Sequence, residues 1–132
     1  MYHVLLGVDD DEELAEEIAD AITDLPGEPE DVFVSVFHSF VENPSGASAT
    51  QVGPVRRATE RLEEAGYEHE VLEGSGDPAE AILQTARDED IDAIAIGGRS
   101  RSPAGKALFG SVAQTVILNA DRPVVVAGKA ED

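Results

Sequence analysis

The sequence predicts an α/β fold in which one five-stranded parallel sheet carries helices on both faces, within a single domain over residues 1–132. Short β-rich segments alternate along the chain with segments whose apolar residues recur every three or four positions. Residues 91–98, IDAIAIGG, are almost continuously apolar, as expected for a central parallel strand covered on both faces. Alternating strands and helices at this spacing form right-handed βαβ units, which build a doubly wound sheet.

The first elements are a strand, an acidic helix and a second strand. Residues 2–8, YHVLLGV, predict the first strand, and the acidic cluster 9–13 suits the positive end of a helix. Apolar residues at 3,4 spacing extend that helix to about Asp24. Residues 31–40, DVFVSVFHSF, favour a second strand, and the Pro-, Gly- and Ser-containing segment 41–53 is typical of a loop.

The middle of the chain repeats this order. Residues 54–65 carry apolar side chains on one helical face, and Gly66 is a suitable C-terminal stop. Residues 67–73, YEHEVLE, predict the third strand. A third helix is expected over 78–88, because Asp77 can cap it and proline is favoured at the first helical position.

The last part of the chain supplies the central strand and the final strand. After 91–98 comes a glycine- and serine-rich loop, and a fourth helix is expected to start near Ser111. Residues 122–128, RPVVVAG, predict the fifth strand. Ligands of such sheets bind at the carboxyl ends of the strands where the strand order reverses, so we expect a site at the loops after strands one and four.

The charge balance is extreme, with 28 acidic residues against 9 Lys and Arg and a net charge of −19. This charge disfavours contact with nucleic acid or an anionic membrane and suits a surface solvated by a high-salt cytoplasm. The chain has no cysteine, which excludes disulfides and thiolate chemistry. No apolar run is long enough to span a bilayer, and residues 1–13 show no leader, so we expect a cytoplasmic protein.

Two stretches, 93–120 and 43–59, contain no acidic residue. Their basic residues are Arg99, Arg101, Lys106, Arg56 and Arg57. Burial explains the absence of acid from the apolar strand within 93–120, but not from the polar loop that follows it. Because the rest of the surface is negative, we interpret both stretches as places that admit an anion.

The loop GGRSRSPAGKALFGS, residues 97–111, carries the chemistry expected of a phosphate site. Backbone amides in a glycine-rich loop approach phosphate oxygens closely, and the following helix start adds a partial positive charge. Taken singly, Gly97 and Gly98 would also fit a tight turn, and Ser111 an ordinary N-cap. The spacing is not that of a Walker A loop, since no Gly-Lys-Ser/Thr precedes the helix.

This loop resembles that of the universal stress protein family, whose nucleotide-binding members carry Gly-x-x-Gly, nine residues, then Gly-Ser/Thr. Gly97, Ser100, Gly110 and Ser111 occupy those positions, with serine in place of the second glycine. The resemblance extends to VLLGVDDDEE, to GSGDPAEAILQTARDEDIDAIAIGG and to RPVVVAG, as in an acidic, haloarchaeal-like member. It implies a Rossmann-like sheet of the adenine nucleotide alpha hydrolase-like type.

The resemblance implies a site for ATP, accompanied by Mg²⁺. The residues implied for adenine and ribose are Val8, Asp9 and Val36. Those implied for ribose and phosphates are Ile96, Gly97, Arg99, Ser100, Gly110, Ser111 and Val112. A glycine at the second motif position would permit positive φ, so we expect Ser100 to strain or displace the loop and to weaken binding without abolishing it.

The implied function is a sensor or regulatory module of the stress response, forming a homodimer through residues 122–128, where family members pair antiparallel. A strand of this kind at a sheet edge would otherwise invite uncontrolled pairing. The alternative is a family member that binds no nucleotide and acts as a dimeric interaction protein, which the serine at position 100 favours. We expect no catalytic residues and at most slow ATP hydrolysis.

Two other kinds of site are disfavoured. Asp9, Asp10 and Asp11 would suit the acid pocket of a phosphoryl-accepting receiver domain, but the third predicted strand ends at Glu73 without an aspartate to accept phosphate. The three histidines are isolated in sequence and lack metal-ligand spacing, so we interpret them as packing or surface residues and expect no metal site. They are His3, His38 and His69.

Overall fold

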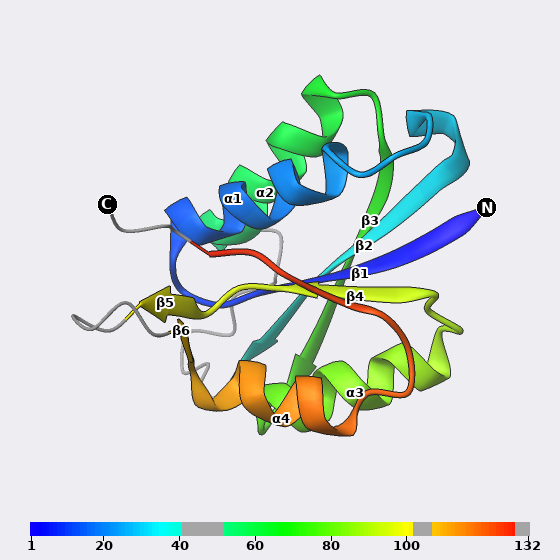
Figure 1. The fold of residues 1–132 in the computed structure, drawn as a ribbon. Helices are drawn as coiled ribbons and strands as arrows, with labels where there is room; N and C mark the ends of the chain where they lie inside the picture. The colour runs from blue at the N-terminus through cyan, green and yellow to red at the C-terminus, as the bar shows by residue number, and fades with distance from the viewer. Residues whose placement is uncertain (41–51, 102–106, 129–132) are drawn as a thin grey trace.

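A computed structural model describes residues 1–40, 52–101 and 107–128, with the backbone alone at 99–101 and 107–108 (Figure 1). The central sheet contains β1 (Tyr2–Val8), β2 (Val32–Phe40), β3 (Glu68–Ser75), β4 (Ala93–Ile96) and β7 (Val124–Val126). All its neighbouring strands pair in parallel, in the order β3-β2-β1-β4-β7. The chain therefore builds outward from β1 to β3 and then returns to β4, so the strand order reverses between β1 and β4, as predicted.

Helices cover both faces of this sheet, which confirms the predicted doubly wound α/β class (Figure 1). One face carries α1 (Glu12–Thr23) and α2 (Gly53–Glu64), and the other carries α3 (Pro78–Asp88) and α4 (Ser111–Asn119). A short 3-10 turn, η1 (Pro29–Asp31), leads into β2. Within the described ranges, every helix is too short or too polar to cross a bilayer.

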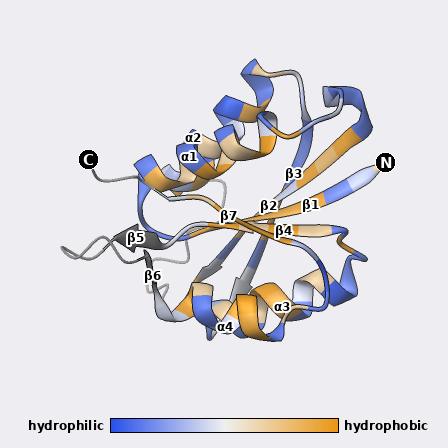
Figure 2. Ribbon diagram, in the orientation of Figure 1, coloured by the Kyte–Doolittle hydropathy of each residue, from blue (hydrophilic) through white to orange (hydrophobic). Residues whose placement is uncertain are grey.

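The sheet separates two apolar cores. Along β1, Val4 and Leu6 pack under α1 and α2, whereas Leu5 packs against α3 and α4. Both faces of the central strands are therefore buried, which accounts for their continuous apolar runs. Figure 2 shows hydrophobic residues along these strands and hydrophilic residues at the turns, together with a hydrophobic stretch on α4, where Leu118 is 80% exposed.

The ends of the helices agree with the sequence prediction. The carboxylates of Asp11 and Asp77 cap α1 and α3 by accepting from the amides of Leu14, at 3.1 Å, and Glu80, at 3.0 Å. Gly66 ends the turn after α2 with a φ of +85°, a conformation that costs glycine little.

The glycine- and serine-rich loop after β4 contains two strands that the sequence did not predict. They are β5 (Arg99–Arg101) and β6 (Ala107–Phe109), which pair antiparallel in a separate two-stranded sheet. Each has three residues, and that length gives no readable alternation of apolar and polar positions. The fifth predicted strand is shorter than expected, and most of the predicted loop 41–53 lies outside the described residues.

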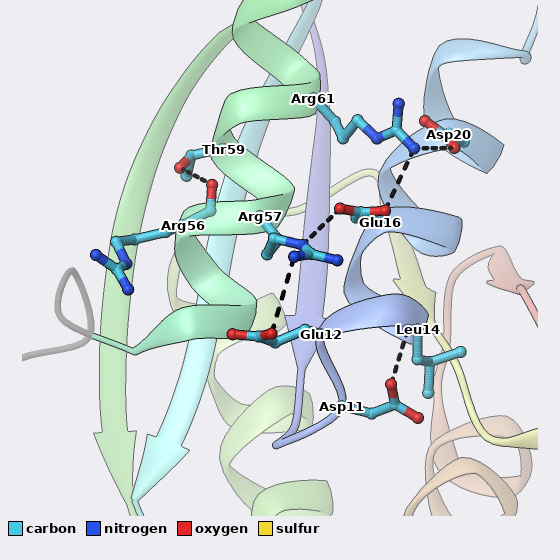
Figure 3. Close-up of polar contacts among 9 residues, drawn as sticks. All are labelled: Asp11, Glu12, Leu14, Glu16, Asp20, Arg56, Arg57, Thr59 and Arg61. Carbon is cyan, nitrogen blue, oxygen red and sulfur yellow. Dashed lines mark hydrogen bonds and ion pairs between the residues drawn. The ribbon is translucent and has the colours of Figure 1, made fainter.

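Arginines of α2 face the acidic side of α1 (Figure 3). Arg57 pairs with Glu12 and Glu16, and Arg61 pairs with Glu16 at 3.3 Å and Asp20 at 3.6 Å. These pairs are partly exposed and each contributes little stability, but they offset repulsion among the carboxylates of α1. Arg57 is thus engaged within the protein, which corrects the prediction that the stretch 43–59 uses it to admit an anion.

Candidate functional site

A cavity of about 750 Å³ opens at the carboxyl ends of β1, β2 and β4. The starts of α1, α2, α3 and α4 complete its wall, so segments from most of the chain meet here. The cavity lies at the reversal of strand order, where doubly wound sheets bind their ligands, and its volume is within the usual range for small-molecule sites.

Most of the predicted ligand-binding residues line this cavity. They are Val8, Asp9, Ile96, Gly97, Gly110, Ser111 and Val112. Val36 is the exception, since it is fully buried in the core under α1 and α2 and is not part of the cavity wall. Arg99 and Ser100 lie in β5, and their side chains, like residues 102–106 with Lys106, lie outside the described part of the structure.

The sequence reasoning missed the wall formed by the end of β2. Phe37, His38, Ser39 and Phe40 line the cavity there, joined by Val52 before α2. A signal was available, because His38 and Ser39 are polar residues at the carboxyl end of an otherwise apolar strand. What the sequence could not supply was the adjacency of β2 and β1, which places that strand end beside the switch point.

Backbone amides at the start of α4 lie outside the helical hydrogen-bond ladder, and their residues line the cavity. Gly110 is the N-cap residue and supplies no side-chain cap, which makes Ser111 the first helical residue rather than the cap. The first intrahelical bond runs from the amide of Gln114 to the carbonyl of Gly110, at 3.0 Å. The amides of the three cavity-lining residues before Gln114 therefore precede the helical ladder, at the positive end of the helix dipole.

A tight glycine turn after β4 is hydrogen-bonded to this helix start. Gly98 has a φ of +103°, and its carbonyl accepts a 3.0 Å hydrogen bond from the amide of Gly110. A Cβ on Gly97 would lie 2.5–2.6 Å from side-chain carbons of Leu14, so the backbone passes directly under that residue. The geometry thus requires both glycines: Gly97 because a side chain there would collide with Leu14, and Gly98 because its φ is positive.

The predicted strain at Ser100 is wrong. Ser100 lies in extended strand β5, where it pairs with Leu108. Among the residues that the structure describes, Asp90 is the only non-glycine residue with a positive φ. The left-handed conformation expected at the second motif position is instead found at Gly98, before the strand begins.

Two exposed acidic residues line the cavity at the end of β1, the strand between β2 and β4. Asp9 and Asp10 line it, and Asp9 Oδ1 accepts a 2.9 Å hydrogen bond from the amide of Asp11. This local turn fixes the Asp9 carboxylate while leaving lone pairs on both its oxygens. Within the described ranges, no three metal-ligating side chains gather into a cluster.

The histidines differ in their surroundings. His3 Nε2 lies 2.7 Å from Ser35 Oγ, and His69 lies 3.7 Å from a carboxylate oxygen of Glu63. His38 is buried in the cavity wall, with 7% of its surface exposed.

Comparison with known proteins identifies the family of this chain. The family model described as the universal stress protein family matches residues 1–128. A universal stress protein of Mycolicibacterium smegmatis is 38% identical over 74 residues, covering 55% of this chain and 57% of the relative. This chain spans about half the length of the curated relatives that it matches.

Solved structures share the whole fold. A universal stress protein from Archaeoglobus fulgidus superposes with a TM-score of 0.74 and 28% identity, covering 96% of this chain and 98% of that one. A universal stress protein from the same organism in complex with dAMP superposes with a TM-score of 0.68 and 24% identity, with coverage of 96% and 98%. The match over almost the entire sequence shows that this chain belongs to the universal stress protein family.

Proposed function

We propose that this protein binds an adenine nucleotide in the cavity at the switch point and serves as a sensor or regulatory module of the stress response. The observation that carries the proposal is the order of surfaces across the cavity. An aromatic and apolar end lies at β2, carboxylates lie at β1, and the first-turn amides of α4 lie beyond β4. The related structure with dAMP shows that this fold accommodates an adenine nucleotide.

The dimensions of the sheet suit a nucleotide lying across the strands. Neighbouring strands are about 4.8 Å apart, so the ends of β2 and β4 are separated by about 10 Å with β1 between them. A nucleotide extends over a comparable length from its base to its 5′ phosphate. The base would therefore lie at β2, the ribose at β1 and the phosphate at the start of α4.

Each part of the nucleotide finds matching chemistry in this arrangement. The amides of Ser111 to Ala113 and the Ser111 hydroxyl would donate to phosphate oxygens at the positive end of α4. Asp9, fixed by the Asp11 amide, would accept from ribose hydroxyls. Phe40 and Val52 would cover the base.

We extend the proposal to ATP, because the basic residues of the acid-free stretch 93–120 would neutralise the charge of a triphosphate. Mg²⁺ would arrive with the phosphates. Protein carboxylates usually supply only part of the coordination shell of Mg²⁺. Consistent with this, the described residues contain no cluster of three metal-ligating side chains.

Calorimetric titration in high salt tests nucleotide binding. We expect heat on addition of ATP and AMP, and binding weaker by roughly tenfold or more for Ser111→Ala, because a hydrogen bond to a charged phosphate is lost. Ser100→Gly should change the affinity little, because Ser100 needs no positive φ. A folded protein that gives no heat with ATP, ADP or AMP would contradict the proposal.

The alternative function is a dimeric interaction protein without a nucleotide. The exposed apolar side chains of α4 favour it, since Leu118 is 80% and Ile117 38% exposed. The first-turn amides of α4 and the glycine turn beside the cavity oppose it, because an interaction surface does not need them. The same titration separates these two functions.

We also propose a homodimer through residues 122–128. β7 lies at the edge of the sheet, and the 2.8 Å bond from the Ala127 amide to the Ile96 carbonyl shows that its odd-numbered residues face β4. The amides of Val124 and Val126 therefore face the open edge. Light scattering should show a dimer of the 13.9 kDa chain, and Val126→Pro should give a folded monomer because it removes one outward donor.

Val125→Pro is the control for the dimer, since it would break the ladder to β4 and unfold the chain instead. A wild-type protein that is monomeric at micromolar concentration in molar salt would exclude this interface.

The net charge supports the further proposal of a cytoplasm rich in salt. At −19 the folded chain repels itself once screening is withdrawn, and the screening length grows by about tenfold between multi-molar and about 10 mM salt. We expect the melting temperature, followed by circular dichroism, to fall steeply on dilution of KCl. Equal melting temperatures at both concentrations would contradict the halophilic interpretation.

A further inference from the structure

His38 occupies the base end of the cavity and has no part in the phosphate or ribose contacts described above. It lies near the end of β2, is 7% exposed and lines the cavity. Its ring contacts Phe40 edge to face, with ring centres 4.7 Å apart and an interplanar angle of 83°. Burial and this contact restrict the ring to one orientation.

The hydrogen bond to β1 determines which ring nitrogen carries the proton. His38 Nδ1 lies 3.2 Å from the carbonyl oxygen of Val8, and a carbonyl oxygen only accepts. Nδ1 must therefore be the donor. In a neutral imidazole this leaves Nε2 as an acceptor, and within the described residues the structure gives Nε2 no partner.

We infer that His38 determines base specificity, with Nε2 accepting a hydrogen bond from the exocyclic amine of adenine. This inference rests on the proposed nucleotide function. A base with a carbonyl at the same ring position would set two acceptors against each other and leave both unsatisfied in a buried site. The cavity would thus select a 6-amino purine over a 6-oxo purine.

AMP and IMP test this selection because they have the same ribose and phosphate and differ at the six-position of the base. Calorimetry should show that the wild type binds AMP at least about tenfold more tightly than IMP. His38→Phe keeps a ring of similar size but has no acceptor, so the two affinities should become nearly equal. Val52→Ala trims the same cavity without removing a polar group and should weaken both nucleotides equally.

The outcomes separate this inference from the proposed function. If the wild type binds AMP and IMP with equal affinity, or if His38→Phe keeps the preference for AMP, the role of His38 is overturned. Nucleotide binding itself would remain intact in both cases. No heat from either nucleotide with a folded protein would overturn both.

A second measurement, by NMR, uses the wild-type protein and needs no variant. The ¹⁵N shifts of the His38 imidazole in the wild type should report a proton on Nδ1 and a bare Nε2, with Nε2 shifting on addition of AMP but not IMP. A proton on Nε2 in the free protein would overturn the inference.

Discussion

Replacing Gly98 by valine is expected to weaken nucleotide binding by roughly 5- to 150-fold. The residue has a φ of +103°, and holding a β-branched side chain there costs about 1–3 kcal/mol. A Cβ at this position would lie 3.6 Å from Ala113 Cβ, an ordinary contact, so the cost comes from the backbone. Relaxing the turn would move the carbonyl that bonds to Gly110 and misalign the start of α4. Calorimetric titration with AMP measures the loss.

Gly27→Val is the matched control for this effect. Gly27 has a φ of +122°, lies in an exposed turn and would place its Cβ more than 4 Å from other atoms. Both variants should lose similar thermal stability, but Gly27→Val should retain wild-type affinity for AMP. Equal affinities in the two variants would show that the turn at Gly98 does not position the site.

Arg122→Ala is expected to destabilise the fold by about 2–5 kcal/mol and to lower the melting temperature by roughly 10 °C or more. The Arg122 guanidinium donates 2.7 Å hydrogen bonds to the carbonyls of Ala86, near the end of α3, and Ile91, before β4. One side chain thus links the end of α3, the residue before β4 and the entrance to β7. Its loss would remove the charged donor from both carbonyls, although the Ala86 carbonyl would keep its 3.0 Å hydrogen bond from the Ile91 amide.

Arg56→Ala provides the control for charge, because it raises the net negative charge by the same amount. Arg56 is exposed on α2 and points away from α1 (Figure 3). Its removal should change the melting temperature little in high salt. Similar melting temperatures for the two variants would show that Arg122 acts only through net charge.

Acid should weaken the Arg122 contact with its neighbour Asp121. The hydrogen bond from the Arg122 guanidinium lowers the pKa of the exposed Asp121 carboxyl below its ordinary value of 3.8. Because the pKa of Asp121 is lower in the folded state, its interaction with Arg122 stabilises the fold fully when the pH is above the ordinary value. This stabilisation is lost as the pH falls through the lowered pKa.

The fold was largely predictable because its signals are local. The apolar runs of β1 and β4, the acidic cluster at the start of α1 and the capping residue Asp77 each depend on a few neighbouring residues. β5 and β6 were missed because strands of three residues are too short to show a sequence pattern and depend on the backbone pairing between them.

The sequence predicted those parts of the site whose residues belong to a single strand end or a single loop. The glycine turn and the start of α4 lie at the two ends of one loop in the sequence, residues 97–111, and both line the cavity. The β2 wall was missed because it depends on how strands pair in space. The contact expected from the backbone of Val36 stays a prediction. Its side chain is buried in the core under α1 and α2, whereas the neighbouring Phe37 lines the cavity, because successive residues on a strand face opposite sides of the sheet.

Amide chemical-shift mapping tests the central claim most directly, using adenosine and ribose 5-phosphate as separate halves of AMP. Adenosine should shift the amides of His38 to Phe40, ribose 5-phosphate should shift those of Gly97, Gly98 and Ser111 to Ala113, and AMP should shift both groups. Shifts confined to another surface, such as the hollow lined by Phe33, Tyr67 and His69, or no shifts with a folded protein, would contradict nucleotide binding across the strand ends.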